Sequence, residues 1–92
     1  ARHYPRVRVV APAALRATWE AAARRARVRS PDFISYERLS AGYLPPAPAP
    51  PLLVLDEAHH ARNPATRRYR TLASLAQGAD VLLLSATPIH NR

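Results

Sequence analysis

Two adjacent carboxylates, Asp56 and Glu57, come directly after the continuous apolar run 52–55. Carboxylates beside a buried strand carry a desolvation cost, which a divalent metal ion or a water molecule awaiting activation would offset. The pair therefore suggests a site for metal-assisted hydrolysis. A strand that ends in a solvated acidic turn explains the same two residues equally well, so the pair alone leaves both interpretations open.

A second continuous apolar run, 81–84, ends in the polar stretch 85–88, which reads Ser-Ala-Thr-Pro. Apolar strands on either side of a helix predict a βαβ unit in a parallel sheet that is covered on both faces. Both strands of such a unit point the same way. Asp56 and Glu57 should therefore emerge with residues 85–87 at the carboxyl edge of the sheet, where open α/β sheets bind ligands.

The helix between these two strands has clear start and stop signals. Asn63 and Pro64 predict its beginning, with the Asn side chain as N-cap and the Pro at the first helical position. Gly78 predicts its end, so we expect a helix over about 63–77. Apolar residues at helical spacing predict the inner face of this helix, namely Tyr69, Leu72, Leu75 and Ala76.

The beginning of the chain predicts another strand and helix. The β-branched run 7–11 predicts the strand, and Pro12 suits the first turn of the helix that follows. The segment 13–27 has a strongly helical composition with one apolar stripe. Trp19 lies on this stripe, which favours a core position beneath the sheet over a platform for stacking bases.

The middle of the chain is less regular. A short strand is predicted over 33–36, followed by one helical turn over 37–41 that Gly42 stops. The segment 42–51 holds half of the ten prolines, which excludes a helix or a central strand and favours a stiff connector. An SH3-type ligand is the less favoured interpretation of its PxxP spacing.

These elements together predict an α/β fold of one domain, with three α/β/α layers and a mostly parallel sheet. A chain of 92 residues is long enough for at most one small domain. The strands are predicted near 7–11, 33–36, 52–56 and 81–86.

The composition limits the classes of function. Fourteen arginines, no lysine and six acidic residues produce a formal charge of +8, which suits a polyanion such as nucleic acid. Codon bias in a GC-rich genome explains the same arginines. The absence of cysteine excludes disulfides, thiolate metal sites and a cysteine nucleophile. No apolar run approaches the roughly 20 residues that span a bilayer, so we expect a cytoplasmic protein without membrane contact.

Longer strings around the carboxylates carry a resemblance to a known family. The string LLVLDEAHHARN (52–63) and the string VLLLSATPIHN (81–91) together resemble motifs II and III of the superfamily 2 helicases. Within these strings, the pair Arg62-Asn63 and the ending TPIHN (87–91) are most similar to the corresponding motifs of the Swi/Snf-type DNA translocases. Upstream, VRVVAPAALRATW (7–19) resembles motif Ia and FISYERL (33–39) resembles motif Ib, so the resemblance covers nearly the whole chain in the expected order.

The resemblance implies a role for each residue of the DEAH string. Asp56 would hold Mg²⁺, usually through water, and Glu57 would orient and deprotonate the water that attacks the γ-phosphate of ATP. His59 would link the nucleotide site to motif III. Phosphoryl transfer needs both charge neutralisation by a metal ion and an aligned nucleophile, which these residue types supply.

The resemblance also implies coupling and nucleic-acid contacts elsewhere. Ser85 and Thr87 would hydrogen-bond toward motif II and report the nucleotide state to the DNA-binding face, with Ala86 between them. Ser35 and the helix start would lie along the nucleic-acid backbone. The residues at that helix start are Pro12, Ala13 and Ala14. A helix N-terminus suits phosphate because its free N–H groups and its dipole attract anions.

The phosphate-binding loop of such an ATPase is missing from these 92 residues. A G-x-x-x-x-G-K-[ST] loop needs a lysine and closely spaced glycines, whereas this chain has no lysine and only Gly42 and Gly78. The resemblance implies that the loop lies upstream, and that a second RecA-like domain lies downstream. We therefore expect residues 1–92 to be part of the first RecA-like (P-loop NTPase) domain of a longer, nucleoid-associated bacterial protein that acts on double-stranded DNA.

Two expectations follow for the 92 residues alone. The intact protein would use ATP and Mg²⁺, but we expect neither to bind tightly to this chain, which should be inactive by itself. Without the strand of the phosphate-binding loop, the strand near 81–86 should lie at an exposed edge and favour self-association.

Two other functions remain open from the sequence. One is a non-enzymatic, basic nucleic-acid-binding module that keeps the motifs as relics, and the other is part of a DEAH-type RNA helicase. Single residues have plainer interpretations: His59 and His60 lack zinc-site spacing, so His60 is taken as a solvated turn residue. An exposed helix face explains Arg67, Arg68 and Arg70 as well as DNA contact does.

Overall fold

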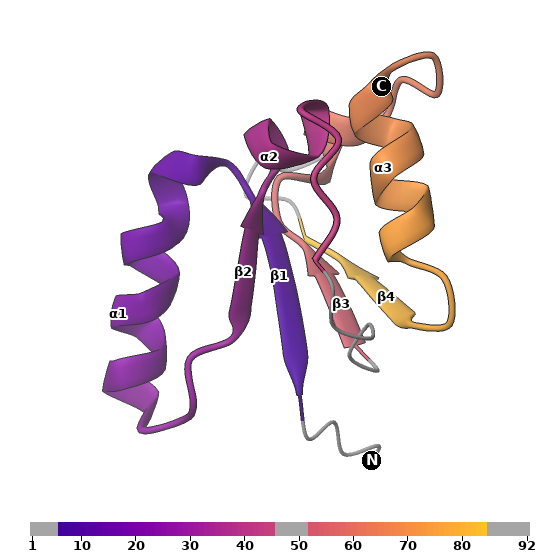
Figure 1. The fold of residues 1–92 in the computed structure, drawn as a ribbon. Helices are drawn as coiled ribbons and strands as arrows, with labels where there is room; N and C mark the ends of the chain where they lie inside the picture. Colours follow the sequence, from indigo (N-terminus) through magenta and orange to yellow (C-terminus); the bar gives the residue numbers. More distant parts are fainter. Residues whose placement is uncertain (1–5, 46–51, 85–92) are drawn as a thin grey trace, which may run out of the picture.

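A four-stranded, all-parallel sheet forms the centre of the chain in a computed structural model that describes residues 6–45 and 52–84. The strands lie in the order β2-β1-β3-β4, so β3 is internal and β2 and β4 are the two edges (Figure 1). Their bounds are Val7–Ala11 for β1, Asp32–Ser35 for β2, Leu52–Leu55 for β3 and Asp80–Leu83 for β4. The predicted α/β class and parallel sheet are confirmed.

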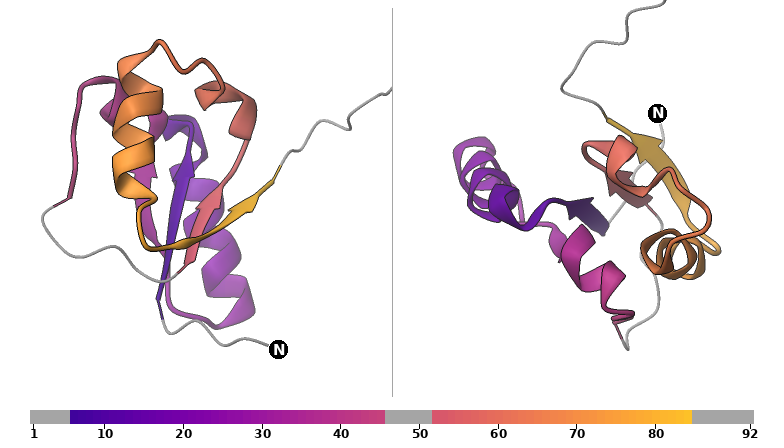
Figure 2. Two further views of the ribbon diagram at one scale, coloured as in Figure 1. Left: turned by 90° about the vertical axis from the view of Figure 1, so that its right-hand side faces the viewer. Right: turned by 90° about the horizontal axis from the view of Figure 1, so that it is seen from above.

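Helices cover both faces of this sheet. One face carries α1, while α2 and α3 lie on the other (Figure 2). The helical segments are the 3-10 turn η1 at Ala13–Leu15, α1 at Arg16–Ala26, α2 at Tyr36–Ser40, the 3-10 turn η2 at Ala58–Ala61 and α3 at Arg67–Leu75. The three α/β/α layers are as predicted, and the arrangement is compatible with part of a RecA-like domain.

Side chains alternate between the two faces of each strand and build two apolar clusters. On the α1 face the buried residues are Val9, Ala11 and Val54, with Trp19 packed against them. The cluster on the other face consists of Val10, Ile34, Tyr36, Leu39, Leu53, Leu55, Ala61, Leu72 and Leu75. Trp19 therefore lies against the core beneath the sheet, as its position on the apolar stripe predicted.

One charged side chain is buried in the sheet. Arg8 on β1 is 3% exposed, and its Nε donates to the Asp32 carboxylate at 2.6 Å. The two residues are register partners in the parallel pair β1·β2. This ion pair offsets the desolvation of the guanidinium, and no pattern in the sequence predicts it.

The strand bounds differ slightly from the predicted ones. The second strand begins and ends one residue earlier than predicted, because Ser35 caps α2 and Tyr36 is already helical. The third strand ends at Leu55, and the fourth begins at Asp80. The predicted end of the fourth strand at 85–86 lies outside the described residues.

The predicted start of the third helix is wrong. The Oδ1 atom of Asn63 accepts from the backbone N–H of Ala65 at 3.0 Å, which closes a local turn instead of capping a helix. Thr66 is the N-cap of α3, because its Oγ1 accepts from the Tyr69 N–H at 3.1 Å. The helix therefore begins about one turn later than Asn63 and Pro64 indicated.

The inner face of α3 is largely as predicted. Leu72 and Leu75 are buried, and Ala76 packs partly against them. Tyr69 is the exception because it is 39% exposed, and the buried Thr71 takes part in the inner face instead. Tyr69 lies in the first turn of α3, three residues after the N-cap Thr66.

The first helix also begins later than predicted. Pro12 precedes the 3-10 turn η1, and regular α-helix starts only at Arg16. The helical turn before Gly42 is confirmed as α2, and Gly42 has a φ of +85° that suits glycine. Of the predicted connector 42–51, only residues 42–45 lie within the described residues. Among the described residues, no helix is long and apolar enough to cross a membrane.

Candidate functional site

The carboxyl ends of all four strands meet at one edge of the sheet, because every strand pair is parallel. The turn after β3 carries Asp56 and Glu57, and the segment after β1 leads into η1 at the same edge (Figure 1). The end of β4 is also beside them, since the Ala58 N–H donates to the Leu84 carbonyl at 3.3 Å. The carboxyl ends of β3 and β4 therefore lie side by side at this edge, whereas residues 85–87, which were predicted to emerge with Asp56 and Glu57, lie outside the described residues.

Asp56 is held by three different elements. Its backbone N–H donates to the Val10 carbonyl at 2.8 Å, which extends the β1·β3 ladder by one bond. Its carboxylate Oδ2 accepts from the indole N–H of Trp19 on α1 at 3.0 Å. Its own carbonyl accepts from the hydroxyl of Tyr36 at 2.9 Å. Both the backbone and the side chain of Asp56 are thereby oriented.

The backbone changes direction at Glu57. This residue has φ +54° and ψ +52°, a left-handed conformation that is uncommon for a residue other than glycine. Backbone strain of this kind is concentrated at functional sites in proteins. The carboxylate Oε1 lies 3.7 Å from Nδ1 of His59, which belongs to the 3-10 turn η2 that follows.

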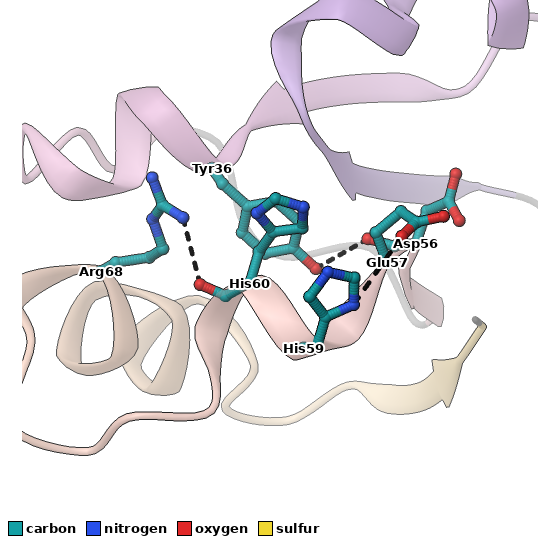
Figure 3. A network of polar contacts seen from close by, with 6 residues as sticks. All are labelled: Tyr36, Asp56, Glu57, His59, His60 and Arg68. Atoms are coloured by element: carbon teal, nitrogen blue, oxygen red, sulfur yellow. Dashed lines mark hydrogen bonds and ion pairs between the residues drawn. The ribbon is translucent and has the colours of Figure 1, made fainter. Parts of the chain in front are cut away.

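The two histidine rings of η2 lie beside each other, and the ring of His60 also stacks on an aromatic side chain (Figure 3). Their ring centroids are 4.5 Å apart, and the ring of His60 stacks on Tyr36 at 5.4 Å with an interplanar angle of 21°. Arg68 on α3 donates to the His60 carbonyl at 3.1 Å. His60 is exposed, as the sequence predicted, but it is also an ordered neighbour of the carboxylate turn.

Tyr36 links the turn after β3 to the core. It is 1% exposed, and its hydroxyl donates to the Asp56 carbonyl. Burial raises the pKa of Tyr36 to about 12, and the nearby negative charge of Asp56 acts in the same direction. The hydroxyl is therefore a proton donor throughout the ordinary pH range, which keeps its hydrogen bond to Asp56 intact.

The start of the first helical segment already has an anionic partner. The backbone N–H of Ala13 donates to the carboxylate of Glu37 at 3.0 Å. Hydrogen bonds from the N–H of Glu37 itself and from that of Ala13 hold the pKa of the Glu37 carboxyl below its usual value. Pro12, Ala13 and Ala14 thus lie at the carboxyl edge, with one of their N–H groups facing a side chain of the same chain.

Ser35 has a local structural role. It is 5% exposed, and its Oγ accepts from the Arg38 N–H at 3.1 Å as the N-cap of α2. Its position at the end of β2 brings it to the same edge as Asp56 and Ala13. Ser85, Ala86 and Thr87 lie outside the described residues, so the predicted coupling contacts are not described.

Two aromatic residues at this edge were missed as site residues by the sequence analysis. The apolar stripe of segment 13–27 predicts a core position for Trp19, and the strand predicted over 33–36 gives Tyr36 no role in a site. A signal for Trp19 does exist in the sequence, since a partly buried indole N–H normally finds an acceptor. Nothing in the sequence identified that acceptor as Asp56, which lies 37 positions away.

The donor set suits a magnesium ion at Asp56. Mg²⁺ prefers oxygen ligands and keeps several of its waters. An ionised carboxylate has about four lone-pair positions, so the hydrogen bond from Trp19 leaves Asp56 able to accept from a metal-bound water. The residues that would bind the phosphates of a nucleotide are lacking, because the chain contains no lysine and no glycine-rich phosphate loop.

Comparison of this chain with protein-family models and with curated proteins finds no match. The assignment of a function therefore depends on the residues at the carboxyl edge and on the resemblance of their motifs.

Proposed function

We propose that this chain is part of the first RecA-like ATPase domain of an ATP-dependent, Swi/Snf-like DNA translocase. One observation supports the proposal above the others: Asp56 and Glu57 follow the internal strand of an all-parallel sheet, at its carboxyl edge. Ligands of open α/β sheets bind at that edge. The strands within the motif strings resembling Ia, Ib and II all end at that edge, and the strings follow one another in the order expected for the family.

In this proposal each residue of the DEAH turn has a separate role in ATP hydrolysis. Asp56 is the residue that would hold Mg²⁺, and its carboxylate is kept in place by the Trp19 indole. The metal ion, when bound, supplies charge neutralisation on the phosphates. Glu57 would orient the attacking water and accept its proton. His59, 3.7 Å from the Glu57 carboxylate, would relay the state of the site toward residues 85–87.

The proposal assigns the rest of the machinery to other parts of a longer protein. A phosphate-binding loop and a second RecA-like domain would complete the ATP site, and double-stranded DNA would be the partner. Within the present chain, the segment Pro12–Ala14 and Ser35 would follow the nucleic-acid backbone. The chain alone should neither bind ATP tightly nor hydrolyse it, since its 92 residues contain no lysine.

The test is an ATPase measurement on the protein as its gene encodes it, with any flanking sequence. Duplex DNA should stimulate hydrolysis, and Glu57→Gln should lower kcat at least about 100-fold because a general base is lost. Glu20→Gln is the matched control, since it makes the same chemical change on α1. Loss of activity in both variants, or full activity in Glu57→Gln, would refute the assignment of Glu57.

A non-enzymatic nucleic-acid-binding module is the second candidate, and the formal charge of +8 favours it. Such a module would bind duplex DNA with a steep salt dependence, and the reading frame around it would encode no GKT or GKS loop. Stimulation of ATP hydrolysis by RNA instead of duplex DNA would identify the third alternative, a DEAH-type RNA helicase.

A further inference from the structure

Three potential metal ligands converge beside the turn after β3. Glu57, His59 and His60, here called the η2 triad, each offer one ligand atom, and these atoms all lie within 4.8 Å of one another. One pair of these residues is joined by a contact of 3.7 Å between the Glu57 Oε1 and the His59 Nδ1 (Figure 3). This convergence is not visible in the sequence, where adjacent histidines have no zinc-site spacing.

The backbone conformation brings these side chains together. Adjacent residues of an ordinary α-helix point in different directions and do not face each other. Here the chain is left-handed at Glu57 and then enters the 3-10 turn η2, so that the rings of His59 and His60 lie 4.5 Å apart. The Glu57 carboxylate turns back toward the same side.

The triad is also partly ordered in advance. The His60 ring stacks on Tyr36, which is itself anchored by its hydroxyl to the Asp56 carbonyl. The His60 carbonyl accepts from Arg68, which fixes the backbone beneath the ring. A site whose ligands are held before binding loses less conformational entropy when an ion arrives.

The ligand types select the class of metal. Two imidazole nitrogens and one carboxylate oxygen suit Zn²⁺, Co²⁺ and related transition-metal ions, whereas Mg²⁺ and Ca²⁺ prefer oxygen alone. Bonds of about 2.0–2.1 Å in a tetrahedral zinc site place neighbouring ligand atoms roughly 3.3 Å apart. The 3.7 Å pair is near this spacing, and rotation of the exposed His59 imidazole, which does not stack on Tyr36, can shorten the remaining separations.

The nearby charges allow a cation at this position. Glu57 contributes one negative charge directly, and the carboxylate of Asp56 is on the adjacent residue. The positive charge of Arg68 opposes the cation, but its guanidinium is directed to the His60 carbonyl and the Ser40 hydroxyl. We propose that the η2 triad binds one Zn²⁺ or similar transition-metal ion per chain, with three protein ligands and a water in the fourth position.

This inference goes beyond the proposed function, because it concerns a second kind of metal and does not require ATP hydrolysis. It does have a consequence for that function. Glu57 cannot serve as a ligand of Zn²⁺ and as the base for water at the same time, so micromolar zinc would compete with the proposed chemistry.

The test is a metal titration of the 92-residue chain by calorimetry with Zn²⁺ and by visible absorption with Co²⁺. We expect one saturable site, with Co²⁺ bands of tetrahedral intensity and no displacement by millimolar Mg²⁺. His59→Gln and His60→Gln should each lower the association constant at least about tenfold. Glu20→Gln on α1, outside the triad, is the control and should leave binding unchanged.

The variants separate a lost ligand from a lost fold. Circular dichroism reports the fold of each variant, and His59→Gln is the safer substitution because His59 is exposed and does not stack on Tyr36. Unchanged affinity in folded His59→Gln, an equal loss in Glu20→Gln, or the absence of a saturable Co²⁺ site would overturn the proposal.

Discussion

At the scale of single residues, the contact between Trp19 and Asp56 joins α1 to the turn after β3. The indole nitrogen lies 3.0 Å from Oδ2, so the donor faces a carboxylate and not a neutral acceptor. Hydrogen bonds to charged groups are stronger than neutral ones. Trp19 thus serves two purposes: its ring packs on the core, and its N–H orients the carboxylate.

The strength of this contact is measurable by a double-mutant cycle of Trp19→Phe and Asp56→Ala. We expect a coupling of about 1–2 kcal/mol in the free energy of unfolding, because the hydrogen bond is partly buried. The measurement is urea denaturation followed by circular dichroism. Tryptophan fluorescence is unsuitable because Trp19→Phe removes the only tryptophan of the chain. Additive effects of the two substitutions would mean that the contact contributes nothing to stability.

The pKa of Tyr36 predicts a pH dependence of stability. Its folded value is about 12, against 10.0 for an unperturbed tyrosine. Between these values the unfolded chain loses the proton first, so the stability present below pH 10 is lost as the pH rises toward 12. Linkage sets the loss at roughly 2–3 kcal/mol at most.

Tyr36→Phe is the variant that tests this dependence. It lacks the titrating hydroxyl, so its free energy of unfolding should fall less than that of the wild type between pH 10 and pH 12. Urea denaturation at several pH values is the measurement, and the remaining tyrosines are present in both proteins as an internal control. Parallel pH profiles for the two proteins would contradict the assignment.

At the scale of secondary structure, the start of α3 shows how two local signals compete. Asn63 and Pro64 form a good helix start in isolation. The Asn63 side chain instead accepts a hydrogen bond from the Ala65 N–H, and the helix begins after the N-cap Thr66. The delay leaves residues 62–66 as a link between η2 and α3. Arg68 in the first turn of α3 then reaches the His60 carbonyl.

Thr66→Ala should therefore cost about 1 kcal/mol of stability, the usual effect of removing an N-cap. Asn63→Ala is the matched comparison, because it removes only an exposed turn contact and should change stability by about 0.5 kcal/mol or less. Chemical denaturation of both variants decides between the two positions. A larger effect at Asn63 would place the cap where the sequence alone predicted it.

The start of the first helical segment makes a prediction about nucleic-acid binding. The Glu37 carboxylate accepts a hydrogen bond from the Ala13 N–H, which is one of the backbone groups proposed to face a phosphate of the nucleic acid. If a phosphate binds there, it must displace the Glu37 carboxylate. Glu37→Gln should then raise the affinity for duplex DNA more than Glu20→Gln does, although both add the same net charge.

The measurement is fluorescence anisotropy of labelled duplex DNA at several salt concentrations. General attraction to the charge of the chain affects both variants equally and weakens with salt. An extra gain of several-fold in Glu37→Gln would support contact at Ala13. Equal affinities for the two variants would mean that phosphate does not bind at that position.

At the scale of the whole molecule, the apolar strand β4 lies at one edge of the sheet. The apolar residues of β4 are largely exposed, with Leu83 at 63% and Leu82 at 47%. Among the described strands, β4 pairs only with β3. An apolar edge strand is a template for pairing with another chain, which agrees with the self-association expected from the sequence.

We predict concentration-dependent association of the 92-residue chain that Leu83→Lys reduces. A charged side chain on an edge strand disfavours strand pairing, and an exposed position tolerates the change within about 0.5 kcal/mol. Val28→Lys is the control, because Val28 is 60% exposed at the end of α1, away from β4. Sedimentation velocity would show the prediction to be wrong if both variants associated like the wild type.

Much of the architecture was predictable from local patterns. Continuous apolar runs identify β3 and β4 as strands of a parallel sheet. The predicted burial on both faces holds for β3 but not for β4, whose residues are exposed at the edge of the sheet. The order of strands and helices then predicts the common edge for Asp56 and the end of β4. These inferences need only neighbouring residues and the rules of chain connection.

The contacts that define the candidate site were not predictable in this way. The Trp19–Asp56 hydrogen bond joins residues 37 positions apart, and the Glu37 carboxylate reaches an N–H group 24 positions away. The η2 triad depends on a left-handed residue at Glu57, where no glycine signals a turn. Periodicity and spacing describe what one segment does, whereas these arrangements arise only when distant segments pack and select one conformation for each side chain.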